Sequence, residues 1–240
     1  MNIKDMASNW DSLAAEDSMY VILTDPDKSN NQWDKEEFFA SGVNRIESKM
    51  AQIEKLHAFD KKERALDFGC GLGRLTNPLA GHFSRVDGVD VSEEMIEQAR
   101  GYCKYPERVK YFHNPKTDLS LLDSNAYDFV YSEIVLQHVP PKHQISYVKE
   151  FVRLMQPGGV MFLQTIHAIG WRALVPNWFA EICWQIKYGG RSYIPMYGIP
   201  CNAILRLCKS SGLEVLNHES YSPQVSAQRF TCDEYILKKT

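Results

Sequence analysis

The chain has 240 residues, of which 44% are apolar and 24% are charged, and its formal net charge is −3. This composition is typical of a globular chain and excludes a disordered or collagen-like protein. The nearly balanced charge also excludes a broad electrostatic attraction to nucleic acid or to an anionic membrane. Because the length is just above that of a usual single domain, we expect one globular unit with a small helical appendage.

The sequence shows no targeting or membrane segment. Residues 1–20 mix charged and apolar side chains without an apolar run of signal-peptide length, and no run of about eighteen apolar residues occurs anywhere. The six cysteines include no Cys-x-x-Cys pair, which is a spacing typical of zinc sites. We therefore expect a cytoplasmic protein with reduced thiols, no metal site and no membrane partner.

Residues 1–62 predict a helical cap or lid that precedes the main domain, residues 63–240. Apolar residues of 34–57 recur at the spacing of one helical face, and a shorter helix is expected over 6–23. Asp34 stands three residues before a glutamate, as in a helix-capping box. Aromatic side chains of this region either cover a ligand cleft or pack against the main fold; these are Trp10, Trp33 and Phe38.

From residue 64 onward, short apolar runs alternate with helical patterns. Strands are expected at residues 64–68, 85–91, 109–112, 127–132, 159–165, 213–217 and 229–238. Helices are expected between them at residues 74–83, 93–103, 141–155 and 202–211. This alternation is typical of crossover units, so the sequence predicts an α/β fold with a mostly parallel, seven-stranded sheet and helices on both faces.

Residues 167–200 interrupt the alternation and carry three of the five tryptophans. We expect an inserted helical and aromatic segment after the fifth strand, which either packs as a satellite core or walls a ligand pocket. Its basic residues outnumber its acidic ones, which indicates an anionic substrate or a solvated surface. Candidate substrate contacts in and near this segment are Gln137, Trp171, Arg172, Tyr193 and Tyr197.

A glycine-rich turn follows the first expected strand, where Gly69, Gly71 and Gly73 alternate with other residues. Such a turn lets a ligand approach bare backbone and aims the free amides of a helix start at it. Asp90 ends the second strand, and a carboxylate about twenty residues beyond such a turn reaches the hydroxyls of a ribose. The sequence therefore predicts a site for an adenosine-type ligand. The dinucleotide pattern would need glycine in place of Arg74, so an NAD-linked oxidoreductase is a secondary interpretation.

Five blocks of the sequence resemble, in order, the motifs of class I S-adenosylmethionine-dependent methyltransferases. The resemblance covers about residues 63–166 and implies a Rossmann-like, doubly wound fold. It also implies S-adenosylmethionine as cofactor and S-adenosylhomocysteine as product. The blocks are Leu66–Gly73, Val86–Ser92, Tyr127–Ser132, Val135–Val139 and Pro157–Leu163.

The resemblance implies a set of cofactor contacts. The first glycines of the turn line the methionine part, Asp90 takes the ribose hydroxyls, and Val91 and Met95 flank the adenine. For the adenine edge Asp118 is preferred to Asn114. The full set is Asp67, Gly69, Cys70, Gly71, Asp90, Val91, Met95, Asn114, Asp118, Leu119 and Ser132.

Methyl transfer depends mainly on holding the acceptor in line, which supplies up to about 7–11 kcal/mol for well-positioned groups. A hydroxyl acceptor also needs a base. His138, just past the fourth strand, is the first candidate, and His167, just past the fifth, is the second. A structural role for His138, hydrogen-bonded to backbone, is the alternative interpretation.

The sequence thus predicts methyl transfer to a small molecule at a hydroxyl or carboxyl oxygen, with nitrogen as the next choice. A catalytically silent protein that binds S-adenosylmethionine is the alternative. Ser132-Glu133-Ile134-Val135 stands where amino-methylating nucleic-acid enzymes carry an Asn-Pro-Pro-Tyr type motif, so no nucleic-acid partner is expected. Either a monomer or a homodimer is compatible with the sequence.

Overall fold

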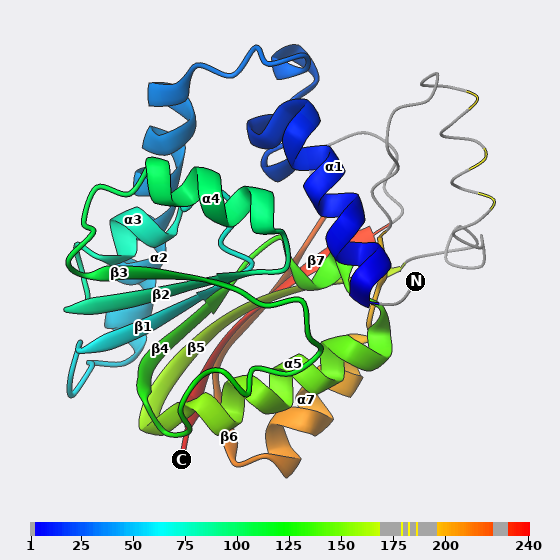
Figure 1. The fold of residues 1–240 in the computed structure, drawn as a ribbon. Helices are drawn as coiled ribbons and strands as arrows, with labels where there is room; N and C mark the ends of the chain where they lie inside the picture. Colours follow the sequence, from blue (N-terminus) through cyan, green and yellow to red (C-terminus); the bar gives the residue numbers. More distant parts are fainter. Residues whose placement is uncertain (1–2, 169–178, 180–181, 183–185, 187–195, 223–229) are drawn as a thin grey trace.

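The computed structural model describes residues 3–168, 179, 182, 186, 196–222 and 230–240 (Figure 1). A seven-stranded sheet with the order β3-β2-β1-β4-β5-β7-β6 forms its centre. Strands β1 to β5 are parallel, and β7 runs antiparallel to both of its neighbours. The predicted mostly parallel α/β sheet is therefore confirmed. The strands are β1 (Arg64–Phe68), β2 (Arg85–Asp90), β3 (Val109–His113), β4 (Tyr127–Ser132), β5 (Met155–Ala168), β6 (Leu213–Tyr221) and β7 (Phe230–Lys239).

Helices cover both faces of the sheet because successive strand residues point to opposite sides. One face buries Ala65 of β1 against α2 (Lys35–Leu56), α3 (Thr76–Leu79) and α4 (Glu93–Gly101). The other face buries Leu66 against α5 (Pro141–Leu154) and α7 (Cys201–Ser210). These layers give the doubly wound arrangement seen in Figure 1.

Helix α1 (Ile3–Ile22) approaches the sheet from the side of α4 (Figure 1). The Asp11 carboxylate accepts a hydrogen bond from the Ser92 hydroxyl at 2.7 Å and one from the Glu94 amide at 3.3 Å. Asp11 therefore anchors α1 to the first turn of α4, where amides lack partners within the helix. The helix bends at Asp17, which has φ −161° and ψ 79°.

Three elements differ most in length from their predicted bounds, and one of them is β6, expected over 213–217 and observed over Leu213–Tyr221. The helix expected over 74–83 is a single turn, because Pro78 has no N–H to donate to the Arg74 carbonyl. Strand β5 is longer than expected, because it pairs with β7 from Val160 to Ala168. In contrast, the Asp34 cap of α2 is confirmed, since its carboxylate accepts the Glu37 amide at 2.8 Å.

Most of the predicted insertion lies outside the described residues, including Trp171, Arg172 and Tyr193. Its last residues, 196–200, return to the core through a hydrogen bond from the Ile199 amide to the Ile166 carbonyl at 2.7 Å. Within the described part of the chain, no helix has the length and apolarity needed to cross a bilayer.

Candidate functional site

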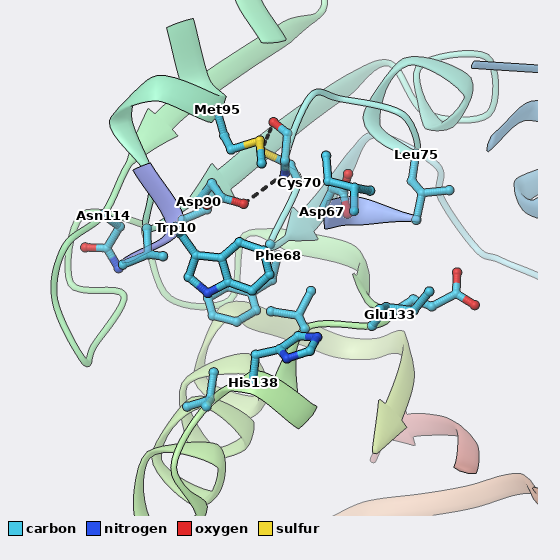
Figure 2. A pocket seen from close by; sticks show the side chains of 18 of the residues that line it. Trp10, Asp67, Phe68, Cys70, Leu75, Asp90, Met95, Asn114, Glu133 and His138 are labelled. Carbon is cyan, nitrogen blue, oxygen red and sulfur yellow. Dashed lines mark hydrogen bonds between the residues drawn. The ribbon is translucent and has the colours of Figure 1, made fainter. Parts of the chain in front are cut away.

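A cleft opens at the carboxyl ends of the central strands (Figure 2). It lies where the sheet order reverses between β1 and β4, the position at which open α/β sheets bind ligands. The lining comes from the ends of β1 and β2, from the segments that follow β1, β3 and β4, and from α1, α4 and α5.

The glycine turn forms one wall of this cleft. Gly69 and Gly71 have φ values of +76° and +49°, a region that favours glycine. A Cβ on Gly69 would lie 2.2 Å from Cγ2 of Val135, and one on Gly71 would lie 2.7 Å from Cδ1 of Ile22. Gly69 therefore requires glycine for space as well as for conformation, whereas at Gly71 the end of the Ile22 side chain can move and the conformation is the main constraint. The Gly69 amide donates to the Val89 carbonyl at 2.7 Å, which fixes the turn against β2.

Asp90 lies directly beside this turn (Figure 2). Its Oδ2 accepts the Gly71 amide and its Oδ1 accepts the Ser92 amide, both at 2.9 Å. Burial raises the pKa of Asp90, and these backbone hydrogen bonds oppose that rise. Each carboxylate oxygen retains a lone pair for a further donor.

Asp67 lies under the turn and is 2% exposed. The Thr76 hydroxyl donates to its Oδ2 at 2.6 Å. Burial raises the pKa of Asp67 to about 7, although the Thr76 hydrogen bond and the Arg74 charge act in the opposite direction. The carboxyl therefore titrates near neutral pH in the protein without ligand.

Arg74 also lines the cleft, with 6% of the residue exposed. Its Nη1 donates to the Ser41 hydroxyl at 3.4 Å, while its Nε has no hydrogen-bond partner among the described residues. Burial lowers the pKa of Arg74, and the Glu133 charge raises it. The sequence marked Arg74 only as a departure from a dinucleotide motif. An unsatisfied N–H on a buried guanidinium marks it as an anion-binding candidate.

His138 faces the cleft from the short 3₁₀ helix η2 (Leu136–His138) and is 8% exposed. The indole of Trp10 meets its ring edge to face, with the ring centroids 5.3 Å apart (Figure 2). Gln137 Nε2 lies 3.1 Å from His138 Nε2. An amide NH₂ only donates, so this imidazole nitrogen carries a lone pair. Trp10 thus lines the cleft, one of the two alternatives that the sequence left open.

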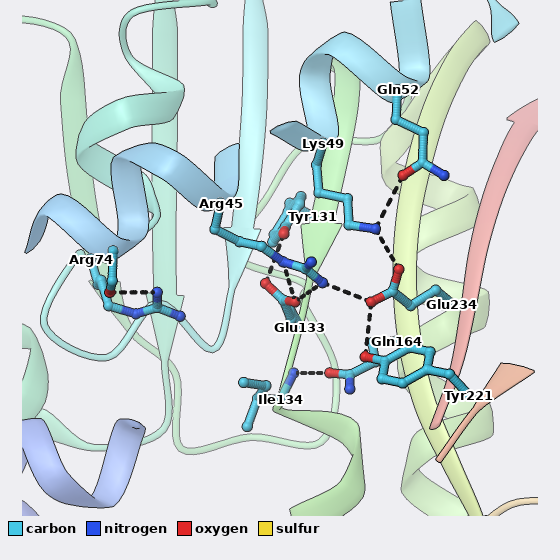
Figure 3. Close-up of polar contacts among 11 residues, drawn as sticks. Arg45, Lys49, Gln52, Arg74, Tyr131, Glu133, Ile134, Gln164, Tyr221 and Glu234 are labelled. Carbon is cyan, nitrogen blue, oxygen red and sulfur yellow. Dashed lines mark hydrogen bonds and ion pairs between the residues drawn. The ribbon is translucent and has the colours of Figure 1, made fainter. Parts of the chain in front are cut away.

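Glu133 and Ile134, which follow β4, also line the cleft. Figure 3 shows their polar contacts. The Glu133 carboxylate accepts the Tyr131 hydroxyl at 2.8 Å and Arg45 Nε at 2.7 Å. Ile134 has φ +59°, a strained conformation for a β-branched residue, and its amide donates to Gln164 Oε1 at 2.7 Å. A strained residue fixed by a buried side chain is typical of a functional loop.

Arg45 links Glu133, which follows β4, to Glu234 of β7 (Figure 3). Its Nη2 donates to Glu234 Oε1 at 2.7 Å, and Lys49 Nζ donates to Glu234 Oε2 at 2.5 Å. Burial alone lowers the pKa of Arg45, but the Glu133 carboxylate raises it above its usual value. Burial raises the pKa of Glu234, and its two cationic partners lower it by more. Arg45 and Glu234 therefore stay ionised, and Arg45 holds Glu133 in place.

Most of the predicted cofactor contacts line the cleft. Asp118 does not, because it is exposed and its carboxylate accepts the nearby Ser120 amide at 3.0 Å. Leu119 and Ser132 are completely buried outside the lining. Asn114 rather than Asp118 reaches the cleft, and its amide donates to the Asp118 carbonyl at 2.8 Å. The predicted contacts that line it are Asp67, Gly69, Cys70, Gly71, Asp90, Val91, Met95 and Asn114.

The other predicted residues separate into two groups. Gln137 and Tyr197 lie together beside His138, because the Tyr197 amide donates to the Gln137 carbonyl at 2.7 Å. His167 lies outside the cleft lining, and its Nδ1 donates to buried Asp233 at 2.5 Å. Sequence reasoning missed further lining residues, which come from distant parts of the chain; they include Met6, Val21, Ile22, Arg74, Glu133, Ile134 and Tyr147.

Comparison with known proteins agrees with this geometry. A methyltransferase-domain family model matches residues 65–159. Ubiquinone biosynthesis O-methyltransferase of Aromatoleum aromaticum is 30% identical over 165 residues, which cover 67% of this chain and 69% of that protein. Its Coxiella burnetii counterpart is 31% identical over 107 residues, and the match spans only 45% of each chain.

Solved structures share the fold over most of the chain. Magnesium protoporphyrin IX methyltransferase from Synechocystis PCC 6803 with bound S-adenosylhomocysteine superposes with a TM-score of 0.66 at 16% identity, covering 99% of both chains. An S-adenosylmethionine-dependent methyltransferase from Mesorhizobium loti gives a TM-score of 0.60 at 20% identity, covering 80% of this chain and 98% of the other. Together with the sequence relatives, they identify the chain as a member of the class I S-adenosylmethionine-dependent methyltransferases.

Proposed function

We propose that this protein transfers the methyl group of S-adenosylmethionine to an oxygen atom of a small-molecule acceptor. The observation that carries this proposal is the arrangement of the glycine turn and Asp90 along one wall of the cleft, with His138 facing it. The names of the O-methyltransferase relatives support oxygen as the acceptor atom.

The residues of the cleft fit the parts of S-adenosylmethionine. The bare backbone at Gly69 and Gly71 leaves room for its methionine portion. The free lone pairs of Asp90 suit the two ribose hydroxyls, and Met95 with Val91 offers an apolar surface for adenine.

The charges of the cleft fit the same molecule. The unpartnered Nε of Arg74 suits the methionine carboxylate, and the buried Asp67 suits the nearby positive charges of the ligand. Asn114 lines the end of the cleft near Val91 and is our candidate for the adenine edge.

The bound cofactor supplies an activated methyl group on its sulfonium sulfur for in-line transfer to a nucleophile. The protein must therefore hold the acceptor, exclude water and accept one proton. His138 Nε2, which already carries a lone pair, accepts the acceptor's hydroxyl proton after the hydroxyl takes the place of the Gln137 amide. Trp10 and Met6 of α1 close the cleft above this position, so residues of the predicted cap act as the lid.

Other predicted features of the acceptor remain predictions. An anionic acceptor was inferred from Arg172, Lys187 and Arg191, which lie outside the described residues. The cytoplasmic location and the choice between monomer and homodimer likewise remain predictions from the sequence.

Calorimetry and a turnover assay test the function directly. We expect saturable binding of S-adenosylmethionine and S-adenosylhomocysteine, and transfer of a labelled methyl group to members of a panel of phenols and carboxylic acids. Binding without S-adenosylhomocysteine formation on any oxygen or nitrogen acceptor would favour the catalytically silent alternative. Absence of binding by folded protein would refute the proposed site.

A further inference from the structure

A second group of chemically reactive side chains lies away from the cleft, where α7 meets β6 and β7. Cys201 is the first residue of α7, His218 lies on β6 and Asp233 lies on β7. One ligand atom from each residue, a sulfur, a nitrogen and an oxygen, lies within 4.8 Å of the others. None of the three lines the cleft, so the methyl-transfer site does not account for the cluster.

We propose that Cys201 Sγ, His218 Nε2 and Asp233 Oδ1 bind a zinc ion. Sulfur, imidazole nitrogen and carboxylate oxygen are the three ligand types that zinc prefers. The proposal is independent of the methyl-transfer function.

The distances within the cluster match a tetrahedral site. With zinc–sulfur and zinc–nitrogen bonds of about 2.3 Å and 2.0 Å, tetrahedral angles place the two ligand atoms about 3.6 Å apart. Cys201 Sγ and His218 Nε2 are 3.6 Å apart. His218 Nε2 and Asp233 Oδ1 are 3.0 Å apart, and all three ligand atoms lie within 4.8 Å of one another, so zinc binding requires the sulfur and the carboxylate oxygen to approach by at most about 1 Å. Three protein ligands leave a fourth position for water.

A proton relay explains this geometry less well. A relay from cysteine through histidine to a carboxylate uses one imidazole nitrogen for each partner. Here the single nitrogen Nε2 of His218 faces the Cys201 sulfur, the Asp233 oxygen and, at 3.4 Å, the Ser220 hydroxyl. Convergence of several lone-pair atoms on one point is typical of a cation site.

The surroundings orient the proposed ligands. His167 Nδ1 donates to the second oxygen of Asp233 and the Ser220 hydroxyl donates to Oδ1, both at 2.5 Å, so Oδ1 keeps one further lone pair for the metal. The Tyr235 ring stacks on His218 with the centroids 4.6 Å apart and the planes 9° apart. Asp233 is completely buried, and a thiolate, a carboxylate and Zn²⁺ together form a neutral unit that suits such a position.

Zinc at this point ties three distant segments together. Helix α7 lies beside β6 in Figure 1, and Cys201 comes directly after residues 196–200, where the chain returns to the core. Zinc binding replaces the Cys201 thiol proton, which passes to solvent, and adds its binding free energy to the folded state. The ion therefore stabilises the point at which the chain re-enters the core.

Metal titration of the full chain, first stripped with a chelator, tests the proposal. We expect one equivalent of Zn²⁺ to bind and to raise the Tm, and Co²⁺ to give a sulfur-to-metal charge-transfer band with the intense visible absorption of a tetrahedral site. Cys201→Ser and His218→Asn should each weaken Zn²⁺ binding by roughly 100-fold or more and abolish the sulfur band. Cys103→Ser, which changes a half-buried cysteine elsewhere, should bind as the wild type does.

If a variant fails to fold, metal titration of the wild-type protein alone still tests the proposal. Absence of stoichiometric Zn²⁺ binding, or a Co²⁺ complex without the sulfur band, overturns the proposal. Equal Zn²⁺ affinity in folded Cys201→Ser overturns it as well.

Discussion

The indole of Trp10 meets the imidazole of His138 at an interplanar angle of 72°, so helix α1 contacts the loop after β4 across the mouth of the cleft. Strands β1 to β4 lie between these two residues in the sequence. The contact brings an N-terminal side chain directly to the candidate base. Closure of the cleft thus depends on a residue outside the matched methyltransferase domain, residues 65–159.

Trp10→Ala should therefore open the cleft. Loss of an aromatic pair costs about 0.5–1.5 kcal/mol beyond the lost buried area, so we expect S-adenosylmethionine affinity to fall by roughly tenfold. Trp33→Ala is the matched control, because Trp33 packs on Phe38 and donates to the Leu23 carbonyl at 3.0 Å without lining the cleft. Calorimetry on both variants measures the difference, and equal affinities would remove α1 as a lid.

Asp90→Asn tests the ribose contact. The amide offers one acceptor oxygen in place of two, and a charge-assisted hydrogen bond is worth about 1.5–3 kcal/mol, so affinity should fall roughly 10-fold to 100-fold. Asp118→Asn is the control, since Asp118 is exposed and distant from the lining. If Asp118→Asn weakens cofactor binding and Asp90→Asn does not, the nucleoside binds beside Asp118, the residue that the sequence favoured for the adenine edge.

The raised pKa of Asp67 predicts a pH dependence of cofactor binding. Below about pH 7 the protein without ligand holds a proton on this carboxyl. A positively charged ligand favours the ionised form, so binding expels the proton and affinity falls by about tenfold per pH unit below the pKa. Above the pKa this contribution is constant.

Asp67→Asn separates this effect from titration of the ligand itself. The ratio of wild-type to variant affinity should rise with pH and level off above about pH 7, as measured by calorimetry in a buffer series. A ratio that does not change between pH 5 and pH 8 would show that Asp67 does not face the positive charge.

His138→Asn should reduce kcat by roughly 100-fold to 10,000-fold for a hydroxyl acceptor, because it removes the proton acceptor, and should lower cofactor affinity by no more than the roughly tenfold expected for loss of the Trp10 contact. His167→Asn should retain kcat, since His167 contacts Asp233 outside the cleft lining. Single-turnover rates across pH measure both effects. Full activity of His138→Asn would leave His138 the structural role that the sequence also allowed.

The sequence predicted the elements whose signals are local. Short apolar runs predict β1 to β5, and the turn from Gly69 to Gly73 needs only neighbouring residues to be recognised. Asp90 follows from its distance to that turn. The single turn of α3 is also a local effect, because Pro78 interrupts the helical hydrogen bonds.

The remaining features of the site depend on contacts between distant residues. Glu133 is held by Arg45, 88 positions away, and Ile134 by Gln164, 30 positions away. No short pattern contains such pairs. The cluster proposed to bind zinc is a further example, because Cys201 and His218 are 17 positions apart, well outside a Cys-x-x-Cys spacing. Whether Asp118 or Asn114 reaches the cleft depends on the path of the loop after β3, which no short pattern predicts.

Arg45→Met tests whether the buried cluster supports the fold as well as the cleft. The variant leaves Glu133, whose side chain is 5% exposed, without its cationic partner. Breaking a buried pair costs about 3–5 kcal/mol, and we expect about 3 kcal/mol because Arg45 is partly exposed and Lys49 still pairs with Glu234.

Lys62→Met is the control, because its ion pair with Glu54 is exposed and such pairs contribute about 0–1 kcal/mol. Urea denaturation at neutral pH gives both free energies of unfolding. The double variant Arg45→Met with Glu133→Gln should recover part of the loss, since it removes the unpaired buried charge. If Arg45→Met is no less stable than Lys62→Met, the cluster does not stabilise the fold, and the position of Glu133 must be fixed by Tyr131 alone.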